Sequence, residues 1–188
     1  MSVMVEASGR HVHLSKDDAD KLFGKDYNFT VKKELSQPGQ YAYEERVTVT
    51  GPKGVIRNVA ILGPCRKDTQ VEISMTDARV LGIKAPTKLS GDIDGTPGCT
   101  ISTERASIDI PKGVIVAKRH IHLTPEDAKR FNVKDNDSLK IKVFADRPLI
   151  FEDLTARISD KFQTSVHIDY DEANACGFKN DTVGLIIQ

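Results

Sequence analysis

Two pairs of histidines are the most informative residues of this 188-residue sequence. His11 and His13 are separated by a single residue, and so are His120 and His122. Because side chains two positions apart on a β-strand point to the same face, each pair can bind one metal ion. A catalytic zinc site usually has three protein ligands and one open position. The two pairs therefore predict two metal sites, each of which needs a further ligand.

A repeat within the chain indicates where these further ligands lie. The segment Arg10–Ala19 resembles Arg119–Ala128, and the segment Val71–Ala78 resembles Val166–Ala173. Both similarities occur in the same order, so the chain looks like a duplication. The repeat by itself predicts two consecutive halves with the same arrangement of side chains.

Glu72 and His167 occupy equivalent positions in the second repeated segment. A lone carboxylate on a strand is more often a solvated residue or an ion-pair partner, so it is the repeat that favours Glu72 as a metal ligand. The predicted ligand sets are His11, His13 and Glu72 for one metal ion, and His120, His122 and His167 for the other. Together these sets use all five histidines of the chain.

Zinc is the metal that we expect at both sites, because the ligand types suit it and its chemistry needs no redox step. Copper, nickel and iron stay open as alternatives, since the usual order of metal affinities does not favour zinc over copper. Arg66 follows a Gly–Pro turn and lies six residues before Glu72. A guanidinium beside a metal ion is suited to bind a tetrahedral oxyanion.

Short strands and small helices must position these residues. The β-rich stretches 46–50 and 138–144 predict strands, and the chain between such stretches contains glycine and proline turns. Ser15 and Thr124 each follow a histidine pair and each precede an Asp by three residues, which predicts two helix starts. Pro125 at the first helical position favours the second start.

Composition excludes several classes of protein. A hydrophobic content of 39% is sufficient for one medium core or two small ones. With 27 basic and 27 acidic residues the formal net charge is zero, so we expect no nucleic-acid partner. No apolar run approaches the roughly 20 residues that cross a bilayer, so we expect no membrane partner and a cytoplasmic location. The three scattered cysteines predict no disulfide framework.

Five segments together resemble the PduL-type phosphate acyltransferases, the phosphate propanoyltransferases that are associated with propanediol utilization. In chain order they are Gly9–Ser15, Leu35–Gln40, Ile61–Pro64, Arg119–His122 and His167–Ala175. The resemblance covers essentially the whole chain. It implies a phosphotransacylase that interconverts a short-chain acyl-CoA (propanoyl-CoA or acetyl-CoA) and orthophosphate with an acyl phosphate and coenzyme A. It also implies direct attack by phosphate at a dizinc site, without an acyl-enzyme.

The resemblance implies a mainly β fold with short helices, an α+β arrangement of two internally duplicated β-barrel domains capped by short helices. In this interpretation one barrel takes residues 1–9 and 118–188. The other takes residues 10–117, with residues 24–44 as a helix or loop insertion. The barrels would then not be the consecutive halves that the repeat alone predicts.

The resemblance also assigns roles to single residues. It implies two zinc ions per chain on the two ligand sets, with Arg66 on phosphate. The residues that it places on coenzyme A are Ser8, Lys33, Leu62, His167 and Asn174. The family usually has an Arg immediately before the segment Ile61–Pro64, where this chain has Ala60. We therefore expect one contact to coenzyme A to be missing.

Two other functions stay open on the sequence. One is a dizinc hydrolase of an ester or phosphoester, in which a metal-bound water attacks. The other is a noncatalytic barrel module whose metals have closed four-ligand spheres. We further expect a homodimer and functional coupling to a kinase that uses acyl phosphate. Family members often carry an N-terminal extension that directs them into a bacterial microcompartment, whereas about seven residues precede the conserved segment here, so we expect no targeting extension.

Overall fold

The computed structural model describes residues 2–187, and the chain divides into two compact units. The residues up to Gly9 and those from Lys118 onward form one unit, which we call the discontinuous unit. Arg10–Ala117 form the other, which we call the middle unit. Each unit has its own cluster of buried apolar side chains, so each has a separate core.

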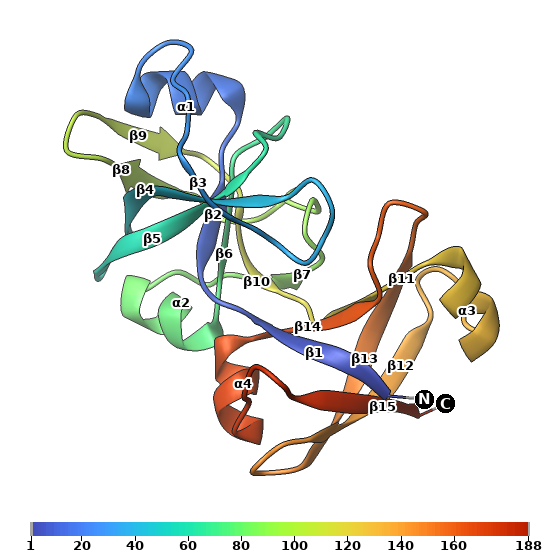
Figure 1. The fold of residues 1–188 in the computed structure, drawn as a ribbon. Coiled ribbons are helices and arrows are strands. Elements are labelled where there is room, and N and C mark those ends of the chain that lie inside the picture. The colour runs from blue at the N-terminus through green and yellow to red at the C-terminus, as the bar shows by residue number, and fades with distance from the viewer. Residues whose placement is uncertain (1, 188) are drawn as a thin grey trace. The chain divides into compact units, whose positions relative to one another are not determined.

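The discontinuous unit is a closed barrel of six strands, in the order β1-β14-β11-β13-β12-β15. The strands are β1 (Ser2–Ser8), β11 (His120–Leu123), β12 (Ser138–Phe144), β13 (Leu149–Ile158), β14 (Ser165–Asp169) and β15 (Val183–Ile187), and the helices are α3 (Pro125–Phe131) and α4 (Tyr170–Cys176). Strand β1, blue in Figure 1, pairs in parallel with β14 and antiparallel with β15, both red. The N-terminal strand therefore closes a barrel whose other strands come from the C-terminal part of the chain.

The middle unit contains a nine-stranded sheet in the order β7-β10-β6-β2-β5-β4-β8-β9, with β3 paired to β4. The strands are β2 (His11–His13), β3 (Val31–Glu34), β4 (Tyr41–Thr50), β5 (Val55–Gly63), β6 (Gln70–Ile73), β7 (Thr87–Lys88), β8 (Cys99–Ser102), β9 (Ser107–Ile110) and β10 (Val114–Ala117), and the helices are α1 (Lys16–Phe23) and α2 (Met75–Leu81). The sheet curls into part of a barrel, and β7 and β9 lie at its two ends.

The predicted fold class, mainly β with short helices in two barrel-like units, is confirmed. Residues 24–44 differ from the expected helix or loop insertion: a loop leads into β3, which pairs antiparallel with the first part of β4. Aromatic packing explains this path, because the ring of Phe29 stacks on that of Tyr43 at 4.8 Å and also contacts Phe23. Burying these rings folds the segment back onto β4.

A helix begins directly after each strand that carries predicted ligands. Ser15 caps α1 and Thr124 caps α3, and each side chain accepts a hydrogen bond from a backbone N–H three residues later, which confirms both predicted helix starts. Ser74 caps α2 and Asp169 caps α4, in both cases with a capping box. The helices are short, and within residues 2–187 none combines the length and apolar character that a membrane-spanning helix needs.

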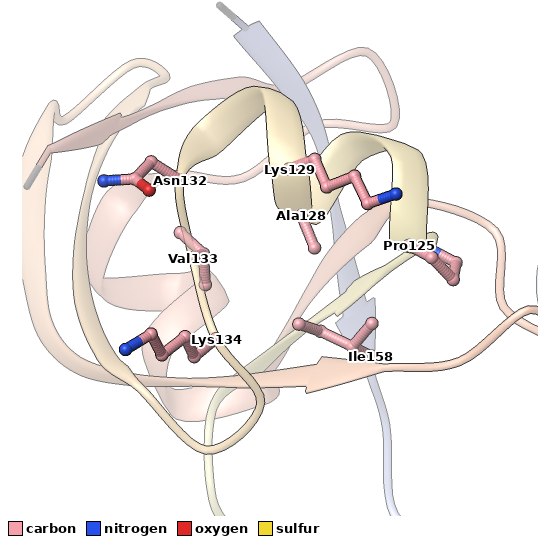
Figure 2. Close-up of a pocket in the computed structure, with 7 residues that line it drawn as sticks. All are labelled: Pro125, Ala128, Lys129, Asn132, Val133, Lys134 and Ile158. Atoms are coloured by element: carbon pink, nitrogen blue, oxygen red, sulfur yellow. The ribbon is translucent and has the colours of Figure 1, made fainter.

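A hollow of about 320 Å³ lies beside α3 in the discontinuous unit (Figure 2). Its lining consists of Pro125, Ala128, Lys129, Asn132, Val133, Lys134 and Ile158. None of these is a predicted ligand or a predicted substrate contact. No carboxylate or imidazole group lines the hollow, so its lining offers no metal ligand of these types. The candidate active site therefore lies around the histidines.

Candidate active site

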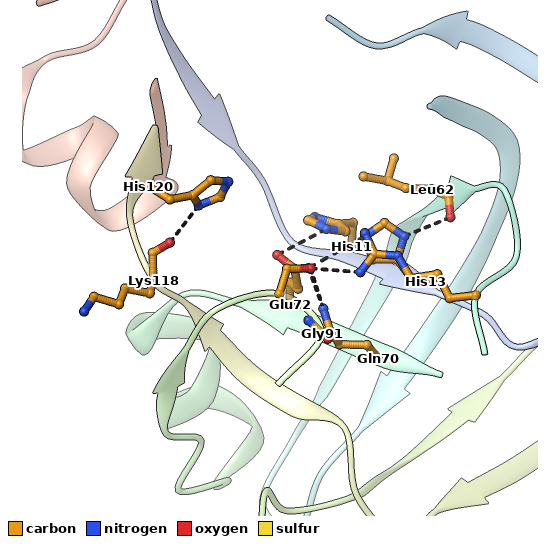
Figure 3. Close-up of polar contacts among 10 residues, drawn as sticks. His11, His13, Leu62, Gln70, Glu72, Gly91, Lys118 and His120 are labelled. Carbon is orange, nitrogen blue, oxygen red and sulfur yellow. Dashed lines mark hydrogen bonds and ion pairs between the residues drawn. The ribbon is translucent and has the colours of Figure 1, made fainter. Parts of the chain in front are cut away.

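Strand β2 lies between β5 and β6 and brings the first predicted ligand set together. The register places His11 opposite Glu72, and His13 opposite Gln70. The side chains of His11, His13 and Glu72 are all buried, and their possible ligand atoms lie within 4.8 Å of one another. The Nε2 atom of His11 is 3.5 Å from Glu72 Oε2, and that of His13 is 3.7 Å from Glu72 Oε1 (Figure 3).

A backbone contact sets the tautomer of His13. Its Nδ1 atom lies 3.2 Å from the carbonyl oxygen of Leu62 (Figure 3). A carbonyl can only accept, so Nδ1 carries the proton and Nε2 presents its lone pair toward Glu72. Burial, aided by His11 and Arg66, lowers the pKa of His13 well below its ordinary value. His13 is therefore a neutral imidazole, the form that binds a metal ion.

Glu72 is a buried carboxylate that stays ionised. Burial alone would raise its pKa, but His11 and a hydrogen bond from Ser90 hold that pKa well below its usual value. Its Oε1 atom accepts hydrogen bonds from Gln70 Nε2 and, at 2.6 Å, from Ser90 Oγ. Within residues 2–187 no Lys or Arg side chain forms an ion pair with Glu72. A buried anion without a fixed cation is costly, so two imidazoles and this carboxylate fit a divalent ion such as zinc.

Strand β11 lies between β13 and β14 and gathers the second predicted set. His120 stands opposite His167 in the register. The ring centroids are 4.8 Å apart for His120 and His122, 5.2 Å for His120 and His167, and 4.9 Å for His122 and His167. The Nδ1 atom of His120 is 2.9 Å from the carbonyl oxygen of Lys118, so it donates there and leaves Nε2 as the ligand atom (Figure 3).

His122 has an unusual buried nitrogen. Its Nδ1 atom has no hydrogen-bond partner among the described residues. Burial, together with His120 and His167, lowers the pKa of His122 to about 2, so the ring is neutral. Its ring stacks on Phe162 at a centroid distance of 4.2 Å. A buried nitrogen without a partner is costly, and a bond to a metal ion would satisfy it. Among the described residues, however, only the first set has its ligand atoms grouped within reach of one ion, so the second metal site stays a prediction.

The structure connects Arg66 to the first ligand set through a serine. Arg66 Nη1 donates to Ser90 Oγ at 2.8 Å, and Ser90 in turn donates to Glu72. Ser90 and Gln70 were not predicted as site residues. Gln70 lies two residues before Glu72 on a strand, so the period of two could have identified it. Ser90 lies in a loop, and its neighbours in the sequence carry no comparable signal.

The arginine immediately before each histidine pair forms an ion pair with a carboxylate on a nearby helix. Arg10 contacts the carboxylate of Asp77 with two nitrogens, each at 3.0 Å. Arg119 pairs through its Nε atom with Glu172, the residue that completes the capping box of α4, and its Nη1 atom donates to the carbonyl oxygen of Glu152. Each pair joins the start of a histidine strand to the helix that follows the third ligand. The repeat contains both arginines, but their partners were not predicted.

Comparison with known proteins identifies the chain. The family model of phosphate propanoyltransferase matches residues 4–179. The chain belongs to this family. A phosphate propanoyltransferase of Clostridioides difficile is 60% identical over 99% of this chain and 89% of its own length. The Listeria monocytogenes protein of that name is 56% identical over 99% of this chain and 87% of its own length. That of Thermotoga maritima is 50% identical over 99% of this chain and 89% of its own length.

Membership of the phosphate propanoyltransferase family confirms the resemblance and makes the protein an acyltransferase, as the sequence predicted. The predicted coenzyme A contacts are distributed over both units. Ser8 ends β1 and stands opposite Asp169, and Asn174 is exposed on α4. In the middle unit, Leu62 touches the first ligand set through its carbonyl, whereas Lys33 is exposed on β3.

Ala60 lies beside the first ligand set. It stands opposite His11 on the adjacent strand, so the two residues share a face of the sheet. The side chain at this position is a methyl group, so it offers no hydrogen-bond donor beside His11.

Proposed function

We propose that this phosphate acyltransferase transfers a propanoyl or acetyl group between coenzyme A and orthophosphate, and that it uses two zinc ions per chain. One observation carries the proposal: the guanidinium of Arg66 is linked through Ser90 to Glu72, a buried carboxylate that is grouped with two histidines. This arrangement puts an oxyanion-binding group beside a candidate metal site. The names of the relatives support phosphate and a propanoyl group as the substrates.

The two ligand sets would each hold one zinc ion. His11, His13 and Glu72 would bind the first, and His120, His122 and His167 would bind the second. When bound, zinc supplies positive charge that stabilises negative charge developing on a thioester carbonyl oxygen and on the departing sulfur. Each set would provide three ligands, and a catalytic zinc site with three protein ligands usually keeps one position open for substrate.

Arg66 binds phosphate and aims one of its oxygens at the thioester carbonyl carbon. The planar guanidinium can hold two phosphate oxygens at once, which fixes the orientation of the third as the nucleophile. An oxygen–carbon bond then forms, the carbon–sulfur bond breaks, and coenzyme A leaves as its thiolate. The contributions of the protein are positioning and electrostatic stabilisation, so both substrates are bound at the same time.

Ser8, Lys33, Leu62, His167 and Asn174 are proposed as the contacts to coenzyme A. Lys33 is exposed on β3, where its ammonium is free to reach a nucleotide phosphate. With Ala60 in place of an arginine, we expect one contact to coenzyme A to be missing. A homodimer and a kinase that consumes the acyl phosphate belong to the same proposal, and they are tested by solution mass and by coupled assays.

Release of coenzyme A with and without phosphate tests the proposed reaction. The purified protein should release coenzyme A from propanoyl-CoA only when phosphate is present, with formation of one acyl phosphate per thiol. Release without phosphate would instead indicate a metal-dependent hydrolase, and no release under either condition would indicate a noncatalytic module. Comparison of acetyl-CoA with propanoyl-CoA under the same conditions gives the preferred acyl group.

A further inference from the structure

The hydroxyl of Ser90 is a junction between three side chains. It lies 2.8 Å from Arg66 Nη1, 3.0 Å from Gln70 Nε2 and 2.6 Å from Glu72 Oε1. Guanidinium and amide nitrogens can only donate, and an ionised carboxylate can only accept. Ser90 therefore accepts from Arg66 and Gln70 and gives its single proton to Glu72. This assignment uses the whole hydrogen-bonding capacity of a hydroxyl group.

Gln70 holds the loop that carries Ser90 in place. Its side chain is 2% exposed, and its amide oxygen accepts a hydrogen bond of 2.8 Å from the backbone N–H of Gly91. The amide nitrogen donates both to Ser90 and to Glu72. One buried side chain on β6 thus fixes the loop and the carboxylate together, because every polar atom of its amide is bound.

We propose that Ser90 is a positioning residue that sets the place of the Arg66 guanidinium relative to the Glu72 carboxylate, with Gln70 as its anchor. Arg66 has a long flexible side chain, and a hydrogen bond to a fixed hydroxyl restricts its conformations. Ser90 also orients one oxygen of Glu72 and leaves the other to face His11. The inference rests on the proposed function of Arg66 in binding phosphate.

Ser90→Thr and Ser90→Val form the matched pair for a test, because threonine and valine have the same shape and only threonine keeps the hydroxyl. Ser90→Val and Ser90→Ala should raise the KM for phosphate about tenfold, the size expected for one hydrogen bond to a charged group. The KM for acyl-CoA should stay unchanged, and Ser90→Thr should retain most of the wild-type value. Ser107→Ala, an exposed serine on β9, is the control for serine removal.

Metal retention is the second readout, and it does not depend on activity. Ser90→Val should release metal to a competing chelator about tenfold faster than Ser90→Thr, because an outer hydrogen bond that orients a ligand generally contributes this much to affinity. The chelator measurement is made on purified protein without substrates. Equal release from the two variants would overturn the link from Ser90 to Glu72.

Arg66→Ala separates failure of this inference from failure of the proposed function. In an Arg66→Ala background, Ser90→Val should have no further effect on the KM for phosphate but should still accelerate metal release. A tenfold phosphate effect that persists without Arg66, or an unchanged KM in Ser90→Val alone, would overturn the positioning role. A wild-type phosphate KM in Arg66→Ala alone would instead refute Arg66 as the phosphate residue, while the chelator result would still decide the link to Glu72.

Discussion

The backbone N–H of Arg66 donates a 2.8 Å hydrogen bond to the carbonyl oxygen of Leu14, the residue that follows His13. The next residue, Ser15, forms an isolated bridge with Arg66 in the same place. The main chain of Arg66 is thus attached to the end of the histidine strand independently of its side chain. Replacing the side chain should therefore remove the guanidinium and leave the loop and the ligand strand in position.

Arg66→Ala should lower turnover by about two to three orders of magnitude, which is the size of the loss when one key oxyanion donor is removed. The KM for phosphate should rise, and the metal content should equal that of the wild type. Arg66→Lys should restore little, because one ammonium cannot hold two phosphate oxygens in a plane. Kinetics with phosphate varied at saturating acyl-CoA, and metal analysis of the same sample, measure both effects.

Near-wild-type turnover of Arg66→Ala would remove Arg66 from the mechanism. Loss of metal from the variant would show that its effect is on the ligand set and not on phosphate. Lys67→Ala is a suitable control, because Lys67 is an exposed cation next to Arg66.

The purified active protein should contain two zinc ions per chain. Both ligand sets offer three side chains whose ring or carboxylate groups lie close together, and each contains a neutral imidazole. A chelator should abolish activity, and added zinc should restore it. Elemental analysis together with protein concentration gives the stoichiometry, and a value of one or none would contradict the proposal.

His13→Ala and His122→Ala should each lose one metal ion and most activity. Removal of one of three ligands weakens a site severely, because the two remaining side chains cannot complete the coordination. Metal content and turnover are measured on the same preparation of each variant. Lys129→Ala, which alters an exposed side chain of α3, serves as the control. Full metal occupancy in either histidine variant would show that its histidine pair is not a ligand pair.

Arg119→Ala should lower the free energy of unfolding by about 1–2 kcal/mol, because the part-buried Glu172 loses a charged hydrogen-bond partner. The corresponding loss for Lys179→Ala should be below about 0.5 kcal/mol, since Lys179 and Asp146 form an exposed ion pair. Urea unfolding of the two variants and of the wild type measures the difference. Equal stability of both variants would mean that the Arg119 contact does not hold α4 to the start of β11.

Local patterns in the sequence were sufficient for the elements around the ligands. The helix starts at Ser15 and Thr124 depend on a capping side chain and a backbone N–H three residues away, which are neighbours along the chain. The spacing of His11 and His13 puts both on one face of a strand for an equally local reason. The repeat then grouped Glu72 with them, and in the structure these three side chains lie within reach of one metal ion.

Only the tertiary structure decided which distant segments meet. Strand β1 pairs with β14 and β15 because this closes the barrel over an apolar core, and such pairing depends on burial across the whole unit. Ser90 joins Arg66 to Glu72 from a loop, where neither a period of two nor a capping pattern marks a residue. Residue types and spacing thus determined the candidate ligands and the reaction class by family, whereas long-range packing determined the hydrogen bonds that position them.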